Sequence, residues 1–166
     1  ASSSCGLCGK ASIESVHGHF EPLAKREPLI TAETLLQLPD KLRAEQETFD
    51  KTGGLHAAGL FDAEGNLLTL REDVGRHNAV DKVLGRSMLD GNFPLENHVL
   101  MVSGRASFEI MQKALAGRVP VICAVSAPSS LAVEFAQESG QTLVGFLRGD
   151  TFNVYSHPER ITGLSD

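Results

Sequence analysis

Hydrophobic and polar positions follow two different spacings along the chain after residue 30. Short, nearly continuous apolar runs lie between longer segments in which apolar residues return every three or four positions, the spacing of a helix. A strand, a short polar loop and a helix occur three times in succession, which predicts an α/β protein with a layered sheet. The expected helices cover residues 75–89, 107–117 and 127–140, and the expected buried strands cover 97–104, 119–126 and 141–148. Residues 149–156 are expected to form a final hairpin or edge strand.

The segment before this alternation predicts two helices followed by a hairpin. A short helix over residues 31–38 should end before Pro39, because a residue that precedes proline avoids the helical region. Pro39 suits the first turn of a second helix, which Gly53 and Gly54 should end. Residues 55–73 predict two strands joined by a turn at 62–66, where Gly65 can adopt a positive φ. On one face of the second helix, the spacing places Leu42, Gln46 and Phe49.

The first 30 residues show no sustained period and are rich in small and polar residues. We therefore expect two parts: a flexible arm over residues 1–30, which carries Cys5 and Cys8, and a single α/β domain over residues 31–166.

Composition and charge exclude several classes of protein. Of 166 residues, 42% are apolar and 22% are charged, which is ordinary for a globular domain. The formal net charge of −6 argues against a nucleic-acid-binding surface, which requires a basic stripe. The chain has no apolar run near the roughly 20 residues of a membrane span, so no membrane association is expected. Three cysteines, an odd number, do not suggest a disulfide framework, so cytoplasmic residence is expected.

Three polar loops follow the carboxyl ends of predicted strands, at residues 71–78, 103–107 and 126–130. Ligands bind at this edge of open α/β sheets, and backbone N–H groups at helix starts favour anions. A phosphorylated, nucleotide-like ligand is one interpretation; ordinary helix caps and turns are the other. The candidate ligand residues in and after these loops are Arg76, His77, Asn78, Asp81, Ser103, Arg105 and Ser126.

The pair Cys5 and Cys8 admits several kinds of chemistry. A zinc site with His17 and His19 would have unusual spacing, and no metal site is predicted. A thioredoxin-like role requires a preceding strand, and a structural disulfide is unusual in a reducing compartment. The remaining interpretation is an exposed thiol pair, in which one member carries a group and the other resolves the adduct by exchange.

Two other reactive residue types are assigned structural roles. Cys123 lies inside an apolar strand and is predicted to be a small core residue. His56 is interpreted as a strand histidine that bonds a backbone carbonyl. A zinc nucleoside deaminase reaction is disfavoured, because its signature places proline before C-x-x-C and here Ser4 precedes Cys5.

Four long motifs carry a family resemblance: "REDVGRHNAVDKV", "VSGRASFEIMQKA", "AVSAPSSLAVE" and "GFLRGDTFNVYSHPERI", together with "CGLCGKASIE" ahead of them. In these motifs the chain closely resembles the formate dehydrogenase accessory sulfurtransferase family (FdhD type). The resemblance runs from Ser4 to about Ile161.

The resemblance implies a three-layer sandwich similar to the cytidine deaminase fold without its zinc. It also implies a homodimer, and an additional N-terminal family region that is absent here. The function it implies is to take sulfur from a cysteine desulfurase as a cysteine persulfide. The sulfur then passes to the molybdenum cofactor, bis(molybdopterin guanine dinucleotide), before that cofactor enters formate dehydrogenase. GDP would be an analogue of this bound substrate.

The resemblance also assigns site residues. Cys5 matches the persulfide-bearing position and Cys8 the accessory thiol. A further cofactor-binding stretch comprises Phe146, Leu147, Arg148, Gly149, Asp150 and Thr151. Two alternatives stay open: a molybdenum-cofactor chaperone that moves no sulfur, and a dithiol oxidoreductase.

Overall fold

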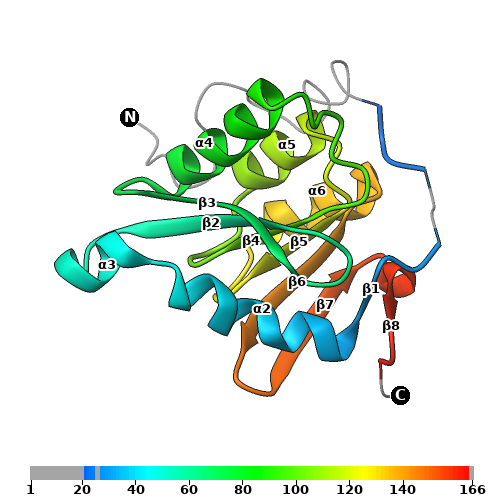
Figure 1. Cartoon of the computed structure of the whole chain (residues 1–166). Helices are drawn as coiled ribbons and strands as arrows, with labels where there is room; N and C mark the ends of the chain where they lie inside the picture. The colour runs from blue at the N-terminus through cyan, green and yellow to red at the C-terminus, as the bar shows by residue number, and fades with distance from the viewer. Residues whose placement is uncertain (1–20, 25–26, 165–166) are drawn as a thin grey trace.

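A computed structural model describes residues 21–24 and 27–164. Its centre is a six-stranded sheet in the order β3-β2-β4-β5-β6-β7 (Figure 1). β2 is antiparallel to both β3 and β4, whereas β4, β5 and β6 are mutually parallel and β7 is antiparallel to β6. The strands are β2 (His56–Phe61), β3 (Leu67–Asp73), β4 (Val99–Val102), β5 (Val121–Ala124), β6 (Thr142–Arg148) and β7 (Thr151–Ser156).

Helices cover both faces of this sheet. α4 (Arg76–Leu89), α5 (Phe108–Ala116) and α6 (Ser130–Ser139) lie above it in Figure 1, and α2 (Ala32–Ala44) and α3 (Glu47–Thr52) lie below. Successive strand residues point to opposite faces, so each strand feeds two separate cores. In β4, Leu100 and Val102 join the core under α4, α5 and α6, while Val99 and Met101 join the core over α2. The predicted α/β class and its three layers are confirmed; the likeness to cytidine deaminase stays a prediction.

Most predicted elements are confirmed within one to three residues at their ends. The turn at residues 62–66 forms as expected: Asp62 and Asn66 close it by backbone and side-chain hydrogen bonds, and Gly65 has φ +76°. Cys123 is fully buried, as predicted, and burial raises the pKa of its thiol. This cysteine is therefore a core residue with little thiolate.

The predicted helix break at Pro39 is wrong. α2 runs through Pro39 to Ala44, and the chain leaves the helix only at Glu45 and Gln46. Proline in a helix interior removes one hydrogen bond and crowds the preceding turn. Here the apolar face that contains Leu35, Leu38 and Leu42 is fully buried against the sheet, and this packing outweighs the local cost.

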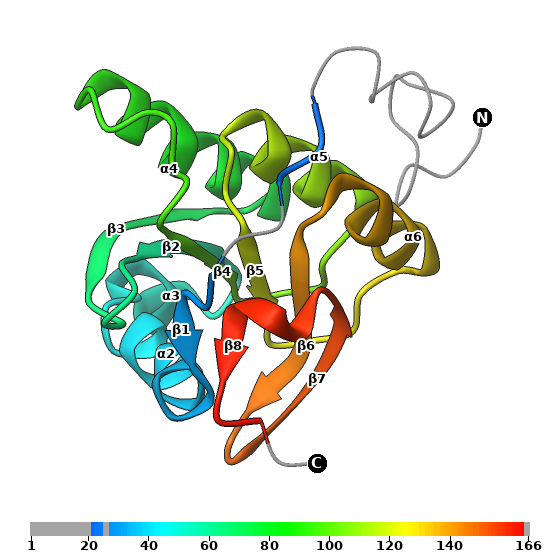
Figure 2. The same ribbon diagram turned by 90° about the vertical axis from the view of Figure 1, so that its right-hand side faces the viewer.

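The residues just before α2 pack on the domain. β1 (Ile30–Thr31) pairs in parallel with β8 (Ile161–Thr162), as Figure 2 shows. Leu23 is buried and donates its backbone N–H to the carbonyl of Ser139 at 2.7 Å. The described residues before 31 are thus attached to the α/β domain, earlier than the predicted boundary; Cys5 and Cys8 lie outside the described residues.

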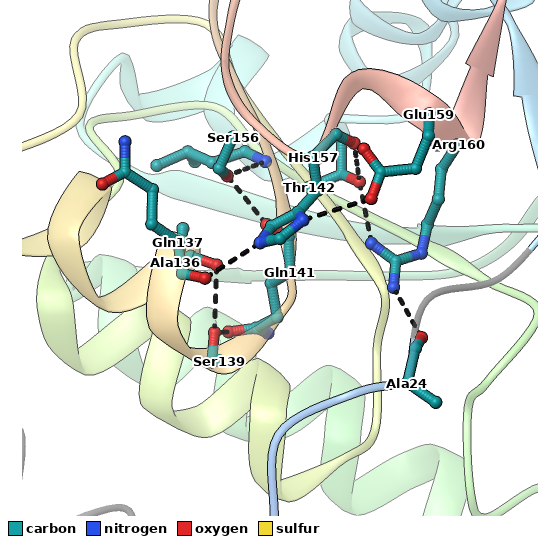
Figure 3. Close-up of polar contacts among 11 residues, drawn as sticks. Ala24, Ala136, Gln137, Ser139, Gln141, Thr142, Ser156, His157, Glu159 and Arg160 are labelled. Atoms are coloured by element: carbon teal, nitrogen blue, oxygen red, sulfur yellow. Dashed lines mark hydrogen bonds and ion pairs between the residues drawn. The ribbon is translucent and has the colours of Figure 1, made fainter.

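A polar cluster surrounds this attachment at the end of α6 (Figure 3). Arg160, from the short 3-10 helix η1 (Pro158–Arg160), is 1% exposed and donates to the Thr142 hydroxyl at 3.1 Å and the Ala24 carbonyl at 3.2 Å. The Ser139 hydroxyl bonds the Gln141 side chain at 2.9 Å. Because these buried groups satisfy one another, the cluster holds the incoming chain at a defined point.

Within the described part of the chain, the helices are too short or too polar to cross a lipid bilayer.

Candidate functional site

One edge of the sheet gathers the loops that the sequence singled out. β3, β4, β5 and β6 run in the same direction, so the loops that follow them emerge at a common edge. β2 runs the opposite way and therefore begins there, with His56 paired to Asp73. We call this the carboxyl edge; it comprises residues 53–56, 73–78, 103–107, 126–130 and 146–151.

Hydrogen bonds tie these loops to one another. The Ser103 hydroxyl accepts the N–H of Ala57 at 2.8 Å, and the Ser103 N–H donates to the Ala57 carbonyl at 2.9 Å. The N–H of Phe146 donates to the Ser126 carbonyl at 3.2 Å. Ser103 therefore binds β2 through Ala57, and the Ser126 carbonyl binds the turn that contains Phe146. The Ser103 hydroxyl accepts in its hydrogen bond with Ala57, so it can donate its own proton to a ligand.

A cavity of about 570 Å³ lies between the carboxyl edge and the α2–α3 connection. We call it the edge pocket. Three residues of the predicted ligand set line it, Ser103, Arg148 and Gly149. Its other lining residues, which the sequence did not assign to a site, include Gln46, Phe49 and His56. A concave site with apolar walls and a few polar groups is the usual form of a small-molecule site.

The turn from β6 to β7 brings Arg148 to this pocket through irregular backbone. The register of β6 against β7 shifts between Gly145 and Arg148, and Phe146 has φ +52°, which is rare for a non-glycine residue. The Arg148 guanidinium lies 5.8 Å from the centre of the Phe146 ring. In the same stretch Leu147 is fully buried in the core, so only its backbone can contact a ligand, while Asp150 and Thr151 are exposed.

The side chains of Arg76 and His56 both lie close to Gly104. A Cβ added at Gly104 would lie 3.3 Å from Nδ1 of His56 and 3.9 Å from Cδ of Arg76. The loop that contains Gly104 thus passes directly against both side chains, and a larger residue there would displace them. Arg105, the next residue, is exposed.

Three other predicted residues form a separate group between α4 and α5. His77, Asn78 and Asp81 line a cavity of about 380 Å³ together with Glu109 and Lys113. Nε2 of His77 lies 2.9 Å from the Ser107 hydroxyl, and Lys113 donates to Asp81 at 2.6 Å. The structure therefore places three predicted ligand residues at each of two cavities. The other predicted ligand residues line neither of these two cavities: Arg76, Arg105, Ser126, Phe146, Leu147, Asp150 and Thr151.

Asp73 organises the start of α4. Its carboxylate accepts from Lys82 at 2.5 Å, from the Gly75 N–H at 2.9 Å and from the Asn78 amide at 3.1 Å. These hydrogen bonds, led by that of Lys82, lower the pKa of Asp73 to about 2. Asn78, a predicted ligand residue, is thus bound within the protein.

Burial lowers the pKa of His77, and the neighbouring Arg76 charge lowers it further. The unfolded chain then binds more protons than the folded chain as the pH falls below the ordinary value of 6.5. His77 should therefore lower the free energy of unfolding at low pH. In His77→Asn, the free energy of unfolding should depend less steeply on pH than in the parent, and the change in slope should correspond to less than one bound proton. Urea unfolding at about pH 7.5 and about pH 5.5 checks this; a variant with an unchanged difference between the two pH values would contradict it.

Among the pocket residues that were not predicted from the sequence, Gln46 stood out in the residue pattern. Gln46 is a polar residue that the helical spacing places on one face with the apolar residues Leu42 and Phe49. His56 carried no such signal, and its predicted bond to a backbone carbonyl is not found among the described residues. In the same described part, no group of three or more His, Cys, Asp or Glu side chains is arranged to hold a metal ion.

Comparisons with known proteins identify relatives along nearly the whole chain. The family model described as the FdhD/NarQ family matches residues 1–162. A protein named sulfur carrier protein FdhD from Streptomyces coelicolor is 58% identical over 161 residues, which are 96% of this chain and 57% of that protein. A protein of the same name from Sulfurisphaera tokodaii is 48% identical over 159 residues, 96% of this chain and 60% of the relative.

Solved structures also share the fold, and one of them is described as a candidate formate dehydrogenase accessory protein from Desulfotalea psychrophila, with 34% sequence identity and a TM-score of 0.78. The match covers 89% of this chain and 62% of that one. The chain spans a little over half the length of the curated relatives described above. By its sequence and its structural match, this chain belongs to the FdhD/NarQ family.

Proposed function

We propose that this chain is a sulfur carrier that supplies the molybdenum cofactor of a formate dehydrogenase. The support is twofold. Relatives at up to 58% identity are named sulfur carrier proteins, and the family match includes the Cys5 and Cys8 pair. The observation that carries the binding part of the proposal is the convergence of Ser103, Arg148 and Gly149 on one edge pocket.

The proposed sulfur transfer balances without an external oxidant. The Cys5 thiolate attacks the terminal sulfur of a persulfide on the cysteine desulfurase. The donor S–S bond breaks, the desulfurase cysteine leaves as a thiolate, and Cys5 becomes the persulfide. Cys8 can then attack Sγ of Cys5, which releases hydrosulfide toward the acceptor and leaves a Cys5–Cys8 disulfide. A cellular thiol reductant reopens that disulfide.

In this proposal the edge pocket receives a guanine nucleotide end of bis(molybdopterin guanine dinucleotide), the substrate. Arg148 supplies a planar cation suited to phosphate. Gly149, with φ +59°, lets the backbone turn closely at the rim. Apolar wall residues such as Leu42 and Val125 suit a ring system.

Covalent geometry permits the cysteines to reach the carboxyl edge. Leu23 is attached beside Ser139, at the end of α6 remote from that edge. The 10 residues of α6 span about 15 Å. The segment between Cys8 and Leu23 has a maximum length of roughly 50 Å, which exceeds the length of α6. A homodimer and a cytoplasmic location stay predictions.

We expect Arg148→Ala to weaken the binding of GDP by about 10- to 100-fold, because a charge-assisted hydrogen bond to phosphate contributes on the order of 1.5–3 kcal/mol. Calorimetric titration of the whole chain with GDP measures this. Arg76→Ala and Arg105→Ala test the neighbouring loops in the same way. Arg86→Ala is the matched control, because Arg86 is exposed and pairs with Asp90 within α4. If Arg76, Arg105 and Arg148 variants all bind like the parent, the proposed site is wrong.

A further inference from the structure

Gln46 is a buried residue whose side-chain amide has no hydrogen-bond partner among the described residues. The residue is only 4% exposed and is one of those that line the edge pocket. Its carboxamide makes no hydrogen bond to any residue in the described part of the chain. Its amide atoms do not belong to the fully enclosed polar atoms without a partner in the described part of the chain, so they retain access to the surface, where a ligand in the pocket can bond them.

Contacts outside the edge pocket fix the backbone on either side of Gln46. Gln46 separates α2 from α3, with φ −84° and ψ 67°, which is not helical backbone. The Glu72 carboxylate from β3 accepts the N–H groups of Thr48 and Phe49 at 2.9 and 2.8 Å. This bidentate contact fixes the first turn of α3 against the sheet. The amide is therefore presented to the pocket by a constrained junction.

The surroundings of the amide suit a flat, polar ring. Phe49 lines the same pocket, and the Arg43 guanidinium lies 4.9 Å from the centre of its ring. Leu42 and Val125 supply apolar wall, and Arg148 supplies a cation at the β6–β7 turn. An aromatic side chain, an amide and a separate cation are the groups that bind a base and its phosphate.

We propose that the Gln46 carboxamide recognises the base of the nucleotide bound in the edge pocket. Guanine presents a ring N–H beside a carbonyl oxygen. The amide oxygen of Gln46 would accept from that N–H, and its NH₂ group would donate to the carbonyl. This inference rests on the proposed function for its ligand and assigns contact with the base to the α2–α3 junction, while Arg148 acts on phosphate.

The test is titration of the whole chain with GDP, ADP and inorganic pyrophosphate. Gln46→Leu keeps the volume and removes both hydrogen-bonding groups. We expect it to lower GDP affinity by about tenfold, as the loss of one or two hydrogen bonds does, and to leave pyrophosphate binding unchanged. Gln46→Glu keeps the acceptor for the guanine N–H but replaces the NH₂ donor by a second acceptor, which repels the guanine carbonyl oxygen. It should therefore weaken GDP binding as well. Because a rotated amide pairs equally with adenine, both variants should also lower the affinity for ADP.

Thermal unfolding of the ligand-free variants separates this role from a structural one. Because the amide makes no hydrogen bond within residues 21–24 and 27–164, Gln46→Leu should unfold at the same temperature as the parent or higher. GDP affinity equal to that of the parent would overturn the inference. So would a joint loss of GDP affinity, pyrophosphate affinity and thermal stability. If the unaltered chain binds no GDP, the ligand under the proposed function is wrong, and the inference falls with it.

Discussion

Cys5→Ala is expected to abolish sulfur loading. A persulfide is a covalent bond to Sγ, and alanine offers no nucleophile to form it. The purified chain would be incubated with a cysteine desulfurase and free cysteine. Intact-protein mass spectrometry without reductant would then count chains that carry one additional sulfur atom. Persulfide at the parent level in the Cys5→Ala variant would refute the assignment.

Two further cysteine variants make this result specific. Cys8→Ala should still load, if Cys5 is the first acceptor, but should release sulfur poorly. Cys123→Ala should load like the parent, because Cys123 is fully buried and its thiol pKa is raised. A chain that lacks both Cys5 and Cys8 yet restores formate dehydrogenase activity would instead favour the cofactor chaperone. Turnover of a generic disulfide would favour the dithiol oxidoreductase.

Gly140→Ala should lower the free energy of unfolding by about 2–4 kcal/mol, from left-handed backbone strain and overpacking together. Gly140 ends α6 with φ +72°. A Cβ there would overlap the carbonyl oxygen of Leu23, whose N–H bonds Ser139. The substitution should therefore loosen the attachment of the segment that follows the two cysteines. Urea unfolding measures the loss.

Gly91→Ala is the matched control for this prediction. Gly91 has φ +76°, but an added Cβ there would contact nothing within 4 Å. It should show the backbone strain alone, of about 1 kcal/mol. If Gly91→Ala and Gly140→Ala lose the same stability, the contact with Leu23 does not hold the chain.

The secondary structure was predictable because its signals are local. The apolar run of β4 and the three-to-four spacing of α5 each repeat within a few residues, so the pattern alone indicates the element. The Asp62–Asn66 turn was equally local, with one glycine at the position that needs positive φ. The prediction at Pro39 was wrong because the deciding contacts are not local. The local preference of Pro39 is outweighed by the burial of Leu35, Leu38 and Leu42 against the sheet, whose strands lie later in the sequence.

The candidate site was only partly predictable. Loops after parallel strands were expected at one edge, and Ser103 lies there, in the edge pocket. Arg148, which the family resemblance indicated, lines the same pocket. The expectation about the loops also grouped His77 and Asp81 with this edge, whereas contacts with Ser107 and Lys113 hold these two residues between α4 and α5. A helix face is defined by sequence spacing, but the element packed against that face is not.

Local spacing of apolar and polar residues was thus sufficient for the order and kind of elements, the buried strands and the turn glycine. The edge pocket could not be predicted from the sequence alone. Gln46, His56 and Arg148 belong to separate elements, which come together only through the strand order of the folded sheet. Side-chain periodicity reports which face of an element is buried. It carries no information about which distant residue lies across from that face, and that pairing decides whether a polar side chain is covered by the core or open to a ligand.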